Sequence, residues 1–121
     1  MYLSKTFHIK LYDTSIQFIV SDNVSAVHNR IANHHKTNDV WDKDESPAGF
    51  TYCISMSKYY MVINSKYISY NTICHELLHC VYGIAFDRGI HEEEARAWIQ
   101  GIVANEIFKF LHKKKVSITY N

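Results

Sequence analysis

The chain has 121 residues, of which 47% are hydrophobic and 21% charged, so it is long enough for one globular domain with a core and too short for two. Its 13 basic and 12 acidic side chains leave a net charge of +1, which gives no reason to expect a nucleic-acid partner. Three cysteines without framework spacing favour a reducing compartment, and neither a signal peptide nor a membrane-spanning run is evident. We therefore expect one cytoplasmic domain over residues 1–121 without a membrane partner.

The first 20 residues predict a β-hairpin. Phe7, Ile9 and Leu11 alternate with polar residues, as on a strand with one apolar face. Residues 16–20 are again rich in β-branched and aromatic side chains, and residues 13–14 fit the turn between the two strands.

A helix and a long loop follow the hairpin. Apolar residues recur at helical spacing over residues 24–35, with Asn23 or Ser25 as the N-cap. Polar and charged residues then fill the stretch 36–49, which contains the only proline and predicts the longest loop. We interpret Trp41, which stands alone in that loop, as an anchor to the body rather than as a substrate contact.

Two short runs, 50–56 and 59–64, are rich in strand-forming residues and predict a second hairpin with a turn at Ser57-Lys58. Together with the first hairpin, these strands predict a small and mostly antiparallel sheet. The second run ends a few residues before the most informative motif of the chain.

That motif is His75-Glu76-Leu77-Leu78-His79, which reads H-E-x-x-H. On a helix, its two histidines lie one turn apart on the same face, with the glutamate beside the first of them. Two neutral imidazoles form a pair of Zn²⁺ ligands, whereas Glu76 lies too far around the helix to be a third. It can instead face a metal-bound water and accept its proton.

The helix around the motif is predicted from about Tyr70 to Phe86, with Ser69 or Asn71 as its cap and residues 87–89 as its end. At about 100° per residue, both histidines lie opposite a broad apolar arc. That arc consists of Ile73, Cys74, Leu77, Val81, Ile84 and Ala85. The core face of this helix therefore needs no histidine.

A second long helix is predicted from about residue 92 to residue 114. Three glutamates begin it and the lysines at 113–115 follow its end, which is the order that the helix dipole favours. We interpret the lysine run as helix-end electrostatics rather than as an RNA-binding or membrane-binding segment. Because its interior is apolar on much of its circumference, we expect this helix to be largely buried.

A catalytic zinc site needs three protein ligands and an open position for water. The metzincin pattern takes its third ligand from a histidine six residues after the second, with a glycine midway. Here Tyr82 occupies the glycine place and Ala85 the histidine place, which excludes that subclass.

A carboxylate on the next helix is the remaining common source of the third zinc ligand. We choose Glu94, because its helix face carries Ala97 and Gly101, which are small enough to let two helices approach closely. Glu93 points about 100° away and is the next alternative, followed by His91.

The cysteines beside the motif, Cys74 and Cys80, are a further alternative, because thiolates bind zinc well. Both lie about 100° around the helix from the adjacent histidine, so we interpret them as buried structural thiols. The remaining histidines lack an acidic or cysteine partner at ligand spacing and are interpreted as ordinary polar residues; they are His8, His28, His34, His35 and His112.

With the H-E-x-x-H motif followed by Glu93-Glu94-Ala95-Arg96-Ala97-Trp98, the sequence resembles a gluzincin. More narrowly, it is similar to the small phage and prophage metallopeptidases of the ImmA/IrrE type, over residues 70–111. The resemblance implies a zincin-like minimal domain in which His75, His79 and Glu94 bind zinc and Glu76 is the general base. It leaves the oxyanion stabiliser unassigned.

The sequence thus predicts an α+β fold in which a small sheet packs against the motif helix and a long C-terminal helix. The expected function is zinc-dependent peptide hydrolysis, in which Glu76 deprotonates a metal-bound water that attacks a peptide carbonyl. We expect the protein or peptide substrate to add to a sheet edge, for which we choose the strand 59–64. The alternative is a non-catalytic zinc-binding module that regulates a partner, whereas a nuclease is disfavoured because no aromatic and basic surface is evident.

Overall fold

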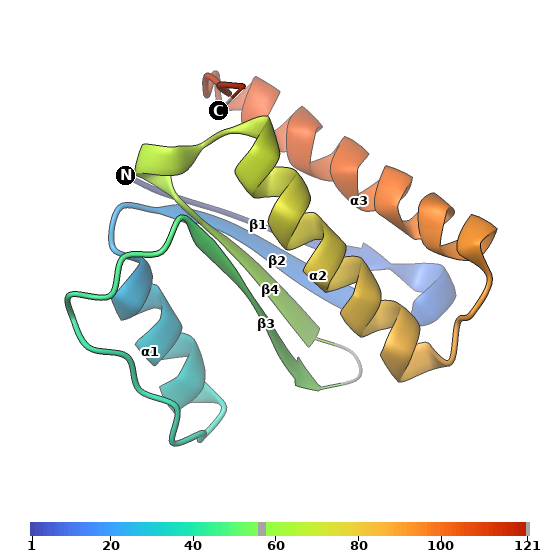
Figure 1. Cartoon of the computed structure of the whole chain (residues 1–121), viewed down its shortest axis with the longest axis horizontal. Coiled ribbons are helices and arrows are strands. Elements are labelled where there is room, and N and C mark those ends of the chain that lie inside the picture. Colours follow the sequence, from blue (N-terminus) through green and yellow to red (C-terminus); the bar gives the residue numbers. More distant parts are fainter. Residues whose placement is uncertain (56–57, 121) are drawn as a thin grey trace.

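The computed structural model describes residues 1–55 and 58–120, and it confirms the α+β class. Its elements are a four-stranded sheet and three α-helices (Figure 1). The strands are β1 (Tyr2–Ile9), β2 (Thr14–Ser21), β3 (Gly49–Ser55) and β4 (Lys58–Asn64), and the helices are α1 (Val24–His34), α2 (Tyr70–Arg88) and α3 (Glu93–Lys113).

The sheet is mixed, with the strand order β1-β2-β4-β3. Strand β1 pairs with β2 and β3 pairs with β4 in antiparallel fashion, whereas the central strands β2 and β4 are parallel. The prediction of a mostly antiparallel sheet is confirmed. The two edges of the sheet are β1 and β3.

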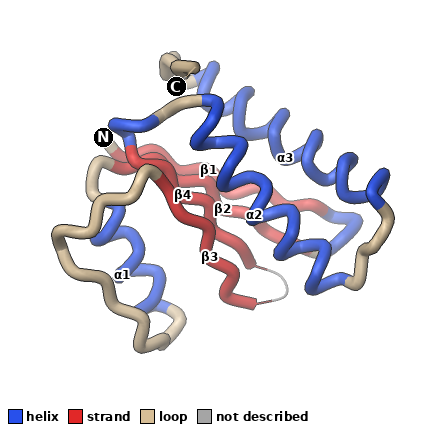
Figure 2. The backbone as a smooth tube through the Cα atoms, in the orientation of Figure 1, coloured by secondary structure: helices blue, strands red, loops and turns tan. Residues whose placement is uncertain are grey.

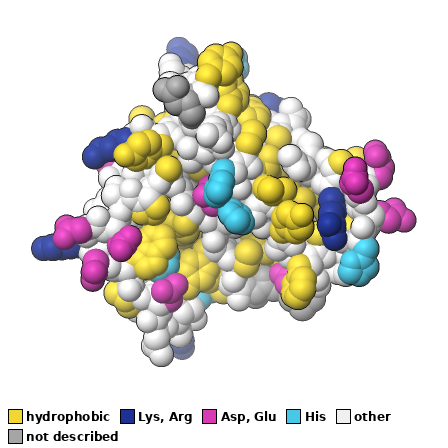
Figure 3. Space-filling view, in the orientation of Figure 1, with side chains coloured by type: hydrophobic (Ala, Val, Ile, Leu, Met, Phe, Trp, Pro, Cys, Tyr) yellow, Lys and Arg dark blue, Asp and Glu magenta, His cyan; other side chains and the backbone are white. Residues whose placement is uncertain are grey.

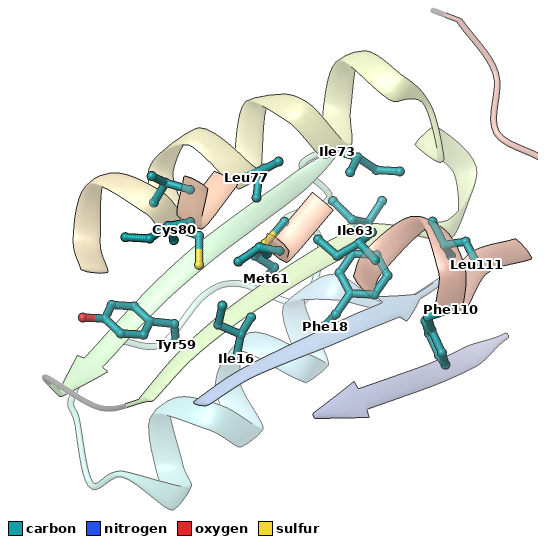
Figure 4. Packing of buried hydrophobic residues seen from close by; sticks show 14 of the residues in the cluster. Ile16, Phe18, Tyr59, Met61, Ile63, Ile73, Leu77, Cys80, Phe110 and Leu111 are labelled. Atoms are coloured by element: carbon teal, nitrogen blue, oxygen red, sulfur yellow. The ribbon is translucent and has the colours of Figure 1, made fainter. Parts of the chain in front are cut away.

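Helices cover both faces of this sheet, with α2 and α3 on one face and α1 on the other (Figures 1 and 2). Strands β2 and β4 are buried along nearly their whole length, because each contributes apolar side chains to both layers. Figure 4 shows the main core, in which Ile73, Leu77 and Cys80 of α2 lie over Met61 and Ile63 of the sheet.

The predicted N-terminal hairpin is present, but its first strand ends earlier than expected. Strand β1 stops at Ile9, and residues Lys10–Tyr12 form a 3-10 turn that is closed by Asp13 in the left-handed conformation, with φ 46°. Leu11 is consequently 69% exposed, so its assignment to the apolar face of the strand is wrong. The tight turn reverses the chain before Leu11 can pair with β2.

The second hairpin is also confirmed, by the antiparallel pairing of β3 with β4. Met56 and Ser57, which belonged to the predicted strand and turn, lie outside the described residues. The choice of the strand 59–64 as a substrate-binding edge is wrong, because β4 pairs with β2 on one side and with β3 on the other. The edge strand next to α2 is β3.

The loop before β3 is held down by Trp41, as predicted. Its indole stacks on His28 of α1 with ring centroids 3.8 Å apart, and its backbone exchanges two hydrogen bonds with the side chain of Asn29. His28 is only 1% exposed and faces Asp39 of the loop at 3.3 Å. His28 is therefore a buried structural residue rather than an ordinary polar one.

Helix α2 begins where the sequence predicts, because the Ser69 side chain accepts a hydrogen bond from the Thr72 amide. It ends at Arg88, two residues later than expected, with Gly89 in the left-handed conformation. Cys80 is buried, as predicted, but Cys74 is exposed, so its assignment as a buried thiol is wrong. The buried arc of α2 is turned towards β3 and includes Glu76 in place of Cys74.

Helix α3 is half exposed, so the prediction that it is largely buried is wrong. A single stripe faces the core, consisting of Ile99, Val103, Ile107, Phe110 and Leu111. Trp98 is 50% exposed, and no atom lies within 4 Å of a Cβ built at Gly101. The face that carries Glu94 is therefore not a helix-packing face. None of the described helices has both the length and the apolar composition needed to cross a membrane.

The glycines of α2 and α3 provide a matched test of how tightly α2 packs on the sheet. A Cβ at Gly83 would lie 2.8 Å from Cys53 Sγ and 3.1 Å from Cε1 of the buried Tyr59, whereas Gly101 faces open space. Gly101→Ala should raise the free energy of unfolding by about 0.5–1 kcal/mol through helix propensity. Gly83→Ala should lower it by about 1–3 kcal/mol through overpacking.

Denaturant unfolding of the two variants measures both effects. A Gly83→Ala variant as stable as Gly101→Ala would show that α2 does not pack closely on β3 and β4.

Candidate functional site

The H-E-x-x-H segment lies on the part of α2 that contacts the edge strand β3. A Cβ at Gly49 would lie 2.8 Å from the backbone oxygen of Val62 and 3.1 Å from Cγ of Glu76, so glycine at the start of β3 makes room for the glutamate. Gly83, one turn after His79, is in similarly close contact with β3 and β4. Two glycines therefore flank the motif along the helix–strand contact.

The two motif histidines converge on one point at the surface. Nε2 of His75 lies 3.3 Å from Nε2 of His79, with ring centroids 4.9 Å apart, and the His75 side chain is 65% exposed. Two nitrogens about 2.0–2.1 Å from a tetrahedral zinc ion are about 3.3–3.4 Å apart. Figure 3 shows adjoining histidine side chains exposed near the centre of the face that α2 crosses. The pair therefore fits two positions of a tetrahedral metal site.

Glu76 lies beside this pair but is buried, with only 6% exposure. The Thr51 hydroxyl on β3 lies 2.9 Å from its Oε1 and 3.0 Å from its backbone oxygen. Its other oxygen, Oε2, lies 3.9 Å from Nε2 of His75. One carboxylate oxygen is thus held by the sheet, and the other faces the position between the histidines and β3.

Two adjoining cavities lie along the trough between β3 and α2. One has a volume of about 480 Å³ and is lined by Phe50, Thr51, Cys53 and the motif residues His75, Glu76 and His79. The other, of about 320 Å³, extends towards Ala48 and the first turn of α2. Both are lined by Gly49, His75 and Glu76, so the glutamate and the first histidine face a groove that follows the edge strand.

Cys53 lines the same groove. Partial burial and then the charge of Asp87 raise the pKa of its thiol. Asp87 also accepts a hydrogen bond from the hydroxyl of the buried Tyr59, and burial together with that bond raises the pKa of Tyr59. This cluster fixes the end of α2 to β4 rather than adding to the site.

Two contacts show how α3 lies against α2. The ring centroids of Tyr70 and Phe108 are 5.6 Å apart, and the guanidinium carbon of Arg96 lies 5.7 Å from the centre of the Tyr82 ring. The residue near the start of α2 contacts the later residue of α3, and the residue further along α2 contacts the earlier one. The two helices are therefore antiparallel, and both pairs fit one alignment of the helices.

In this alignment Glu94 lies opposite Ile84, five residues beyond His79 along α2, which is about 7.5 Å of helical rise. Glu94 lies in the exposed first turn of α3, next to Glu93. Among residues 1–55 and 58–120, no three His, Cys, Asp or Glu side chains form a group that could hold a metal ion. The structure thus brings the motif's own residues together, and the third ligand from α3 stays a prediction.

Comparison of the chain with protein-family models, with curated proteins and with solved structures found no match. Its function must therefore be inferred from its own residues.

Sequence reasoning missed Thr51 and Gly49. The positions of these two residues in the sequence do not point to the motif. Both contact Glu76 only because β3 packs against α2. Gly49, the last residue of the predicted loop and next to a predicted strand, was the one available signal, since glycine in a strand often marks close approach of another segment.

The Thr51 hydroxyl should contribute measurably to stability, because the carboxylate that it contacts is buried. Thr51→Val preserves the shape but removes the hydrogen bond, and should lower the free energy of unfolding by about 1–3 kcal/mol. Thr51→Ser keeps the hydroxyl and is the matched control, with a smaller loss. Denaturant unfolding of the metal-free protein gives both values, and a Thr51→Val variant as stable as the parent would show that this bond does not hold Glu76.

Proposed function

We propose that this protein is a zinc-dependent peptidase of the gluzincin type. The observation that carries the proposal is the convergence of two imidazole nitrogens 3.3 Å apart beside a buried carboxylate. A chance pair of surface histidines next to a glutamate does not require the glutamate to be buried and hydrogen-bonded from a neighbouring strand. His75 and His79 are the proposed metal ligands, and Glu76 is the proposed general base.

A zinc ion held by the two histidines would acidify a bound water and polarise a peptide carbonyl. Glu76 accepts the proton of the attacking water at Oε2, since Oε1 is already engaged by Thr51. It then delivers that proton to the nitrogen of the leaving amine.

The proposed substrate is an extended polypeptide segment that pairs with the free edge of β3. Strand β3 takes the place of β4 as the proposed substrate-binding strand, because β4 is interior to the sheet. The edge of β3 borders the groove that contains His75 and Glu76. Backbone hydrogen bonds to an edge strand bind a peptide without demanding a particular sequence. Leu78 and Tyr82 are exposed on the other flank of the histidines and would contact apolar side chains of such a segment.

The third ligand is proposed to come from the start of α3, with Glu94 first and Glu93 second. In the alignment of the two helices Glu94 lies about 7.5 Å of helical rise beyond His79 and about 13.5 Å beyond His75, so coordination requires its carboxylate to move towards the histidine pair. No described carboxylate forms a three-ligand group with the histidines. The alternative function is a non-catalytic zinc-binding module that regulates a partner.

A Glu76→Gln variant distinguishes the proposed peptidase from the alternative, a non-catalytic zinc-binding module. In Glu76→Gln the amide oxygen can still accept from Thr51, so zinc affinity measured by calorimetry should be retained. Cleavage of an unfolded protein should fall by about 100-fold or more, because the general base is lost. Glu45→Gln, in the exposed loop before β3, is the control and should cleave normally.

Two results would contradict the peptidase. One is full cleavage by Glu76→Gln. The other is tight zinc binding by the parent protein without turnover of any unfolded protein, which would support the binding module.

Replacing the glutamates of α3 tests the third ligand. Glu94→Ala should weaken zinc binding by more than the 10–100-fold that is typical of losing an outer-shell partner. Glu93→Ala should leave zinc affinity unchanged, and the reverse pattern would make Glu93 the ligand. Equal zinc affinity in the parent and both variants would show that neither Glu94 nor Glu93 is the third ligand.

A further inference from the structure

A second cavity of interest lies away from the histidines, between the edge strand β1 and the C-terminal half of α3. It has a volume of about 590 Å³. Lysines line it from both elements, with Lys5 on β1 and Lys109, Lys113 and Lys114 at the end of α3. We call this cavity the basic groove.

The basic groove concentrates the positive charge of an almost neutral chain. Its four lysines and one glutamate, Glu106, carry a formal charge of +3, whereas the whole chain carries +1. Glu106 lies 4.0 Å from Lys109, and both side chains are substantially exposed, so this ion pair is weak. Within residues 1–55 and 58–120, no ion pair joins Lys5, Lys113 or Lys114 to a carboxylate.

Helix-end electrostatics explains only part of this arrangement. Lys113 and Lys114 at the end of α3 complement the helix dipole, as the sequence predicts. Lys109 lies one turn earlier, on the same helix face as Lys113. Lys5 comes from a strand more than 100 residues away in the sequence, yet it lines the same cavity. The convergence of two elements, rather than the lysine run itself, defines the basic groove.

The chemistry of the lining suits a phosphate-bearing anion. The cations of the basic groove are all lysines, and lysine is a common phosphate ligand that acts as a point charge. His112 adds a further nitrogen donor or acceptor, and Phe110, which is largely buried, contributes apolar surface. The volume lies in the range of sites that hold small ligands.

We propose that the basic groove binds phosphate-bearing anions, supplied either as a small polyphosphate or as the backbone of a single nucleic-acid strand. This proposal is independent of the zinc site, because no lining residue belongs to the H-E-x-x-H motif or contributes to its groove.

The test compares two double variants that remove the same charge. Lys109→Ala/Lys113→Ala removes two lysines of the basic groove, whereas Lys43→Ala/Lys66→Ala removes two exposed lysines elsewhere. The probes are tripolyphosphate, followed by calorimetry, and a fluorescent single-stranded oligonucleotide, followed by anisotropy at several salt concentrations. Circular dichroism checks that both variants are folded.

The parent and the Lys43→Ala/Lys66→Ala variant should bind at least one probe equally well. The Lys109→Ala/Lys113→Ala variant should bind it at least about tenfold more weakly, and its salt slope for the oligonucleotide should fall by about 1.4, or 0.7 for each lost phosphate contact. Binding of tripolyphosphate alone identifies a small polyphosphate, whereas binding of the oligonucleotide identifies a nucleic-acid backbone. Absence of millimolar binding to both probes, or equal weakening in the two double variants, would overturn the proposal.

Discussion

The site depends on the close contact between helix α2 and the edge strand β3. Gly49 leaves room for the side chain of Glu76, Gly83 lets the helix lie against Cys53, and the Thr51 hydroxyl holds the carboxylate. Because these contacts bury the glutamate on one flank of α2, the two histidines of the motif are left on the outward face, where their nitrogens converge. A wider separation of α2 and β3 would leave Glu76 exposed and without its Thr51 contact.

Local features of the fold could be predicted because local interactions determine them. The Ser69 cap, the Gly89 stop and the period of the apolar residues define α2, and strand-forming residues separated by short turns define both hairpins. The parallel pairing of β2 with β4 could not be predicted, because it joins segments separated by a helix and a long loop. That pairing decides which strand is an edge, so it also decided that β3, and not β4, borders the site.

The third metal ligand could not be predicted with certainty either, because its position also depends on tertiary packing. A helical wheel shows that Glu94 shares a face with Ala97 and Gly101, but it cannot show whether that face packs against another helix. In the structure the buried stripe of α3 is a different one, and the Glu94 face is exposed. The basic groove was missed for a related reason, since Lys5 and Lys109 meet only through the tertiary fold.

X-ray absorption spectroscopy of the protein loaded with one equivalent of zinc shows whether the converging histidines of α2 bind a metal ion. We expect two imidazole ligands at about 2.0–2.1 Å together with oxygen ligands, and no sulfur shell near 2.3 Å. His79→Ala should lose this spectrum, whereas His112→Ala should retain it. Failure of the parent protein to retain one equivalent of zinc, or a spectrum dominated by sulfur ligands, would show that the histidine pair is not a zinc site.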